Sequence, residues 1–404
     1  MKKFVAILCA VTMAFGLVGC EKNEKRKQVL LTLWASEESH DLMRSLADSF
    51  EEHYKDEADI DVFVGTEPEV SLAENILDKP DEAADVFHFA DDQIVSLMEK
   101  NILMPITENT DQIIEDNGGK DTDAMQCVTF DGKIYAYPVT ASNGYFMFYN
   151  SDYFTEDDVK SLDRMMEVAA KNGKYVAMDW SSGWYLYSFF GGAGLELYMT
   201  DDNKNACNWN STTKEDTGID VAEAMLDIAG NPGFLNTDDD GFLKGVEDGS
   251  IIAGVNGPWN ANAVSGAWGD SYRAVKLPTY TLKGQQVQMS SFMGYKLVGI
   301  NSKTKEAYWS TKLAEWIADY DGQLERFRTT GECPANIRAS EAAEVNSSQV
   351  AVAMAGQMPY SVRQNVAQTF WTPATSLGTI LASGNSDNRD LQEILDKFVE
   401  QVEE

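Results

Sequence analysis

Apolar residues in the first part of the chain alternate between the short runs of strands and the wider spacing of helices. Val29–Trp34 is an apolar run of β type, and 60–64 and 84–89 predict two more strands. Between these runs, 70–77 predicts a helix, and 41–54 predicts another from its apolar positions at Leu42, Met43, Leu46, Ala47 and Phe50. This alternation predicts a parallel sheet with helices on its faces.

Both patterns continue along the rest of the chain. The sequence predicts strands over 133–138, 145–149, 251–255 and 296–300, and helices over 156–171, 184–190 and 219–229. A chain of 404 residues is long enough for two lobes that each bury a core. Because ligands of parallel sheets bind beyond the carboxyl ends of the strands, we expect a site in the loops after Trp34 and Phe89.

The amino-terminal residues have the pattern of a secretory signal. An apolar run over 4–18 follows two lysines, is shorter than a membrane span, and ends at Gly19 and Cys20. A small residue before such a cysteine is typical of a bacterial lipoprotein signal; the alternative is an ordinary secretory signal with an incidental cysteine. We predict a signal over 1–19, lipidation of Cys20, a polar tether over 20–28, and an extracytoplasmic protein anchored to the cell membrane.

Composition limits the partners. The formal net charge of −33 argues against nucleic acid and against an anionic membrane surface, and favours a neutral or cationic ligand. An aromatic content of 11% indicates a globular chain rather than a disordered one.

The cysteines and histidines give no pattern of a zinc site. Cys127, Cys207 and Cys333 are widely spaced, no CxxC pair is present, and the three histidines are isolated. We expect buried thiols, with a single disulfide as the alternative. We expect no metal and no cofactor.

Residues 236–247 have the acidic spacing of an EF-hand calcium loop. Asn236 at the first position and the helix-breaking segment 230–233 count against calcium. Asp240 as the N-cap of a helix over 242–247 is the other interpretation.

Short motifs follow one another along the chain in an order that identifies a family. They are LTLWASEES at 31–39, DVFHFADD at 85–92, DGKIYAYP at 131–138, NGPW at 256–259, Met358-Pro359 and Phe370-Trp371. Together with the lipoprotein signal, this set resembles the maltose/maltodextrin-binding proteins over roughly residues 29–390.

The resemblance implies a periplasmic-binding-protein-like α/β fold of two lobes with discontinuous domains and a hinge. The implied amino-terminal lobe is 29–140 plus 290–340, and the carboxyl-terminal lobe is 141–289 plus 341–404, with crossings near 140, 290 and 340. Such a protein captures malto-oligosaccharides and delivers them, as a monomer, to the permease subunits of an ABC transporter.

Several alternatives remain open. The ligand could be another oligosaccharide, a polyamine or another solute, or the chain could be a lipoprotein for adhesion or sensing. A surface glycosidase needs two carboxylates at a fixed separation, and 65 acidic residues make any sequence pair uninformative. Because the chain has no GxSxG, HExxH or P-loop motif, we expect a binding protein and not an enzyme.

A neutral oligosaccharide presents C–H faces and hydroxyl edges, so its site needs aromatic platforms and polar groups. By resemblance, the platforms are Phe89, Trp184, Trp259 and Trp371, of which Phe89 replaces a tryptophan and Trp184 a tyrosine. Core packing is the alternative role for each.

The polar set comes from the same resemblance. It comprises Glu37, Glu38, Asp92 and Asn143, and Met358 lines the site beside them. Charged acceptors make stronger hydrogen bonds than neutral ones. The family's cations are replaced by Ser39 and Gln93, and Arg363 is a candidate to supply one.

Overall fold

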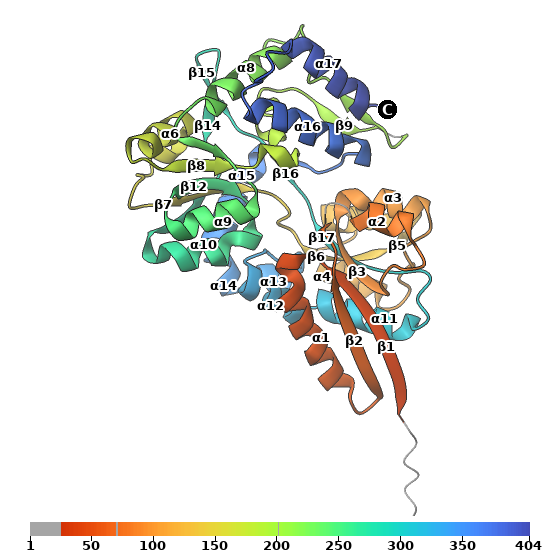
Figure 1. The fold of residues 1–404 in the computed structure, drawn as a ribbon. Coiled ribbons are helices and arrows are strands. Elements are labelled where there is room, and N and C mark those ends of the chain that lie inside the picture. Colours follow the sequence, from red (N-terminus) through yellow and green to blue (C-terminus); the bar gives the residue numbers. More distant parts are fainter. Residues whose placement is uncertain (1–25, 70–71, 201) are drawn as a thin grey trace, which may run out of the picture.

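The computed structural model describes residues 26–69, 72–200 and 202–404, and it shows two α/β lobes, one above the other in Figure 1. The predicted signal over 1–19 and the predicted lipidation of Cys20 lie outside the described residues. Each lobe is built around a five-stranded sheet.

The sheet of the first lobe has the order β2-β1-β3-β17-β6. Its strands are β1 (Lys27–Ala35), β2 (Ala58–Thr66), β3 (Val86–Ala90), β6 (Ala136–Thr140) and β17 (Lys296–Ile300). β1 pairs in parallel with β2 and β3, as predicted, but β17 runs antiparallel to both β3 and β6. The sheet is therefore mixed, and one of its inner strands comes from late in the chain.

Helices cover this sheet, and its strands β3, β6 and β17 are buried along their whole length. α1 (His40–Tyr54) packs against β2, and α11 (Ala307–Ala318) packs against β17 and β6. The other helices up to residue 130, and those between β17 and residue 346, are α2 (Leu72–Asp78), α3 (Ile94–Glu99), α4 (Thr110–Asp116), α5 (Asp123–Gln126), α12 (Tyr320–Thr330), α13 (Ile337–Ser340) and α14 (Ala343–Asn346). A hairpin of β4 (Thr129–Phe130) and β5 (Lys133–Ile134) precedes β6, so the predicted strand over 133–138 is divided.

The sheet of the second lobe has the order β11-β8-β12-β7-β13. Its strands are β7 (Phe146–Asn150), β8 (Tyr175–Met178), β11 (Phe234–Asn236), β12 (Ile251–Asn256) and β13 (Tyr272–Val275). The sequence predicted β7 and β12 but missed the other three, because strands of three or four residues are too short for an apolar period to stand out.

Helices on both faces complete the second lobe (Figure 1). They are α6 (Leu162–Lys171), α7 (Tyr187–Phe190), α8 (Gly218–Ala229), α9 (Asp239–Asp248), α10 (Ala261–Trp268), α15 (Gln349–Gln357), α16 (Trp371–Ala382) and α17 (Leu391–Val402). The smaller strands pair as β9 (Leu197–Met199) with β10 (Asn205–Cys207), β14 (Thr279–Leu282) with β15 (Gln285–Gln288), and β16 (Ser291–Met293) with β18 (Ser361–Arg363). The predicted helices over 156–171 and 184–190 are shorter than expected, since each begins as a 3-10 turn.

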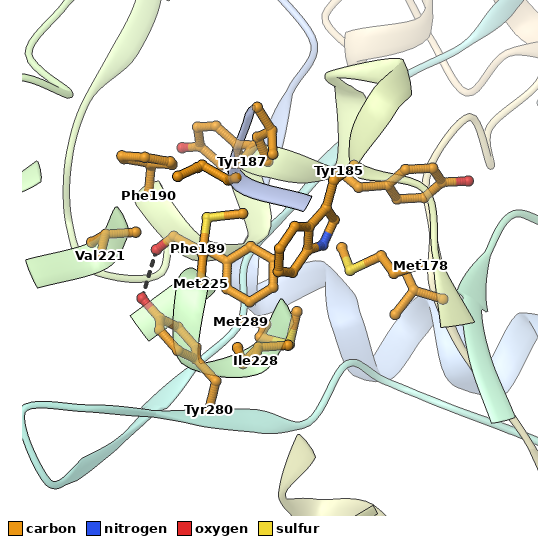
Figure 2. Packing of buried hydrophobic residues seen from close by; sticks show 14 of the residues in the cluster. Met178, Tyr185, Tyr187, Phe189, Phe190, Val221, Met225, Ile228, Tyr280 and Met289 are labelled. Carbon is orange, nitrogen blue, oxygen red and sulfur yellow. Dashed lines mark hydrogen bonds between the residues drawn. The ribbon is translucent and has the colours of Figure 1, made fainter. Parts of the chain in front are cut away.

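Large apolar side chains fill the core of the second lobe. Figure 2 shows Tyr185, Phe189, Met225 and Met289 gathered between helices and strands, and the hydroxyl of Tyr280 donates a hydrogen bond of 2.9 Å to the carbonyl of Phe189. That bond satisfies the one polar atom of a fully buried tyrosine.

An aromatic stack extends this core toward the carboxyl terminus. Trp209 is fully buried, with the ring of Phe190 stacked at 4.3 Å and the ring of Phe398 at 5.3 Å. Phe370 meets it edge-on at 5.9 Å. The stack joins α7 to α17, so the last helix of the chain is fixed to the body of the second lobe.

Three sequence predictions about local chemistry can be compared with the structure. Asp238, not Asp240, caps α9 by accepting the Gly241 N–H at 2.9 Å. The three cysteines of the described chain are free thiols, so the alternative of a disulfide is wrong. Over the described ranges, no group of three or more His, Cys, Asp or Glu side chains is arranged to hold a metal ion.

None of the helices in the described part of the chain has the length and apolar character needed to cross a bilayer.

We predict that Trp209→Ala destabilises the second lobe by about 3–5 kcal/mol, because it removes a buried ring and leaves a cavity between Phe190 and Phe398. Urea unfolding followed by circular dichroism measures this change. Tyr198→Ala is the control, since 53% of that side chain is exposed, and we expect it to change stability by less than about 0.5 kcal/mol. Equal stability of both variants would contradict the importance of the stack.

Candidate functional site between the lobes

The chain crosses between the sheets next to the predicted site. β6 belongs to the first sheet and β7 to the second, and β17 returns to the first sheet directly after β16. Asn143 lies on the first crossing, where its backbone N–H donates to the carbonyl of Gly294 on the second crossing at 3.1 Å. Two crossing segments are thus bonded to each other beside the place where the lobes meet.

An acidic pair follows the carboxyl end of β3, where a 3-10 turn covers Asp91–Gln93. The Asp91 side chain is fully buried, accepts the Tyr295 N–H at 3.3 Å, and pairs with Nε of Arg363 at 3.3 Å. Arg363 ends β18 of the second lobe, so this ion pair joins the two lobes. Burial raises the pKa of Asp91 to about 6, although the charge of Arg363 opposes that rise.

Asp92 is a buried acid that is bonded to the second lobe close to Trp371 in the sequence. Its Oδ2 accepts a hydrogen bond of 3.2 Å from Nε2 of Gln368, which lies three residues before Trp371 on the second lobe. Its Oδ1 is buried without a hydrogen-bond partner among the residues that the structure describes. Burial raises the pKa of Asp92 to about 7, and the neighbouring charge of Asp91 adds to the rise. An acceptor with an unused oxygen at the lobe junction is suited to a ligand hydroxyl.

Trp184 and Trp259 form a pair of indole rings on the second lobe. Their centroids are 5.8 Å apart and their planes differ by 32°. The indole N–H of Trp184 donates to Gln364 at 2.7 Å, and the ring of Tyr145 supports Trp184 edge-on at 4.7 Å. Both indoles are only partly buried, so they differ from the core tryptophans.

Residues of the NGPW segment and Asp239 fix the position of the Trp259 ring. β12 ends at Asn256, and the indole N–H of Trp259 donates to Oδ2 of Asp239 at 2.9 Å. The ring lies back over Gly257, where an added Cβ would come within 2.0 Å of the ring atoms Cη2 and Cζ3. A glycine at 257 is therefore required for this ring position.

The other predicted residues lie in different surroundings. Trp371 is partly buried at the start of α16, edge-on to Phe370 at 5.0 Å. Met358 is 58% exposed in the turn after α15. Glu37 and Glu38 are exposed in the turn that follows β1.

Phe89 requires a correction. It lies in β3 with no exposed surface, packed beside Phe87 at 5.7 Å and against Gly299 in the core of the first lobe. A fully buried ring presents no face to a ligand, so the structure gives Phe89 the alternative role of core packing. Its place in a strand that is buried along its whole length explains this.

Sequence reasoning missed a buried charged cluster directly opposite Trp259. Lys296 begins β17, and its ammonium lies 2.8 Å from Glu332, 3.1 Å from Glu69, and 5.1 Å from the centroid of the Trp259 ring. The one sequence feature that could have indicated this cluster was Lys296, a charged residue at the first position of the otherwise apolar strand KLVGI. Its partners are distant in sequence and could not have been named.

Two cavities lie away from these residues. One of about 350 Å³ is lined by residues between 26 and 60 of the first lobe, and one of about 620 Å³ lies between α9 and α10 of the second. None of the predicted site residues lines either cavity. The candidate site is therefore defined by side chains that meet across the lobe junction.

Comparison with known proteins agrees with this architecture. Residues 45–353 match the bacterial extracellular solute-binding protein family. A galactooligosaccharide-binding protein of Bacillus subtilis (strain 168) is 25% identical over 413 residues, covering 95% of this chain and 93% of that protein.

Solved structures are similar over nearly the whole chain. One, of a protein with acarbose, has a TM-score of 0.80 at 29% identity and covers 93% of this chain and 98% of the other. The maltotriose-binding protein of Thermus thermophilus has a TM-score of 0.76 at 17% identity, with coverage of 92% and 99%, and it supports the two-lobed fold alone.

The expectation of a two-lobed sugar-binding fold is confirmed by these matches. The family match also places the protein outside the cytoplasm. This chain belongs to the bacterial extracellular solute-binding protein family.

Proposed function

We propose that this protein binds a malto-oligosaccharide between its lobes and presents it, as a monomer, to the permease subunits of an ABC importer. The observation that carries the proposal is the pairing of the half-buried Trp184 and Trp259. Asp92, whose Oδ1 has no partner in the described chain, supports it. Flat rings suit the C–H faces of a sugar, and a carboxylate suits its hydroxyls.

Three contacts would change when the lobes move apart. The Asp91–Arg363 pair, the Asp92–Gln368 hydrogen bond and the Lys296–Trp259 contact each join one lobe to the other. We infer that a sugar entering between the lobes replaces part of this set, and that Trp371, Met358, Glu37 and Glu38 border its path. Hinge movement of this kind is a common response of two-lobed binding proteins.

We also propose that the ligand is a malto-oligosaccharide and that the protein binds it without catalysing a reaction. A galactooligosaccharide is the second candidate, because the Bacillus subtilis relative is named for that ligand. We propose that the two lobes, 29–140 plus 290–340 and 141–289 plus 341–404, are the bodies that move relative to each other.

Isothermal calorimetry with the purified protein tests the ligand. We expect binding of maltotriose and maltohexaose, and none of cellobiose or xylotriose. Trp259→Ala and Trp371→Ala each weaken binding at least tenfold, about 1.4 kcal/mol, because a stacking face is lost. Trp268→Ala, in a tryptophan of α10 outside the predicted site, leaves affinity unchanged. If only β-galactotriose gives binding heat, the ligand is a galactooligosaccharide and not a malto-oligosaccharide. If neither site variant changes the affinity, the sugar binds at another place on the protein.

Affinity should depend on pH through Asp92. Its pKa of about 7 leaves the carboxyl largely protonated at pH 6 and ionised at pH 8. Since the ionised form is the stronger acceptor of a sugar hydroxyl, affinity for maltotriose rises by up to roughly tenfold between those values. Asp92→Asn removes the dependence. A wild-type affinity that stays constant from pH 6 to 8 would exclude Asp92 as the acceptor.

We also propose that Cys20 carries the lipid anchor. In a bacterial host, Cys20→Ala should release the protein from the membrane fraction, while Cys127→Ala should not, because Cys127 is a buried free thiol. Fractionation and immunoblotting measure both. Retention of Cys20→Ala in the membrane would refute the anchor.

A further inference from the structure

The lobe junction contains a buried cation held in a fixed position. Lys296 is 6% exposed, and its Nζ lies between Oε1 of Glu332 at 2.8 Å and Oε2 of Glu69 at 3.1 Å. Burial lowers the pKa of Lys296, but the charges of Glu332 and Glu69 outweigh burial and hold that pKa above its ordinary value. The ammonium is therefore charged throughout the neutral range.

One of the two carboxylates, that of Glu332, is itself anchored by a second cation. Oε2 of Glu332 accepts a hydrogen bond of 2.8 Å from Nη1 of the buried Arg326, so Glu332 bridges two cations. Lys296 and Arg326 hold the pKa of Glu332 below its ordinary value in spite of burial. His88, fully buried on the neighbouring strand, has its pKa lowered by burial and by these cations. The set of Lys296, Arg326, Glu332 and Glu69 is formally neutral.

The side of the ammonium that is not bound by carboxylates lies over an aromatic ring of the other lobe. A lysine ammonium has three N–H donors, and two carboxylates account for two of them. The ring of Trp259 has its centroid 5.1 Å from Nζ, and it is fixed by Asp239 and by the absence of a Cβ at Gly257. A rigid donor and a rigid platform thus face each other across the junction.

From this arrangement we infer that Lys296 is a binding residue that donates a hydrogen bond to a hydroxyl of the sugar ring stacked on Trp259. The inference rests on the proposed sugar-binding function. It assigns to the first lobe a donor that complements the acceptor Asp92, so the sugar is held by both lobes. A sugar hydroxyl takes the third N–H, while Glu69 and Glu332 keep the ammonium in place.

The arrangement also bears on which ligands are rejected. An ammonium fixed beside the platform repels a cation stacked at the same place, since like charges in a desolvated site are strongly unfavourable. The site should therefore take neutral sugars and exclude polyamines at Trp259, in spite of the net charge of −33.

The test compares three variants. The first is Lys296→Met, which keeps the length of the side chain but has no hydrogen-bond donor; the second is a double variant and the third is a control. Lys296→Met alone leaves a buried negative charge, whereas the double variant Lys296→Met with Glu69→Gln restores a neutral set. Lys312→Met is the matched control, because Lys312 also pairs with a carboxylate, Glu315, at 2.8 Å and lies 6.0 Å from a ring, Tyr308, but within α11.

Calorimetry with maltotriose on the full protein, after thermal melts have shown that each variant is folded, gives the readout. We expect an affinity loss of at least tenfold in both Lys296 variants and less than twofold in Lys312→Met. Affinity of the double variant within twofold of the wild type would overturn the role of Lys296 while leaving the sugar site intact. A wild-type protein that binds neither maltotriose nor any other sugar tested would overturn the proposed function and this inference together.

Discussion

The two lobes bury separate apolar cores, and the structure depends on that separation. The first core lies around β1, β3 and β17, and the second around β7, β8 and α16, so each lobe buries its sheet without help from the other. The junction between them is then free to use ion pairs, amides and partly exposed indoles. Such contacts can be exchanged for contacts with a polar ligand at small net cost, whereas a shared apolar core could not be opened in this way.

The contacts at the junction come from chain segments that the fold brings together from long distances. Asp92 follows β3, Lys296 begins β17, and Trp259 follows β12. Lys296 begins its strand, and Asp92 and Trp259 lie in the short turns that directly follow theirs, close to backbone that the strand ladders hold in place. A rigid backbone under each polar group explains how a site spread over two bodies can present a definite geometry.

Sequence reasoning was most successful where the signal was local. The strands β1, β2 and β17 and the helix α1 have clear apolar periods, and the NGPW motif led to Trp259 beside Trp184. It failed where tertiary context decides. Phe89 has the composition of a platform, but its strand is buried on both faces. Lys296 was overlooked because Glu69, Glu332 and Arg326 become its neighbours only in the folded chain. The short strands β8, β11 and β13 are defined by their partners more than by their own residues.

The place of β17 between β3 and β6 has a consequence for the order of folding. All five strands of the second sheet come from residues 146–275, but the first sheet needs residues 296–300 to fill the position between two strands made much earlier. As the chain emerges from its amino terminus, the first lobe lacks an inner strand until after the whole second sheet has been made. Pairings of such long sequence separation are slow to form. The first sheet is therefore the later of the two to be completed during synthesis, although it contains the first strands of the chain.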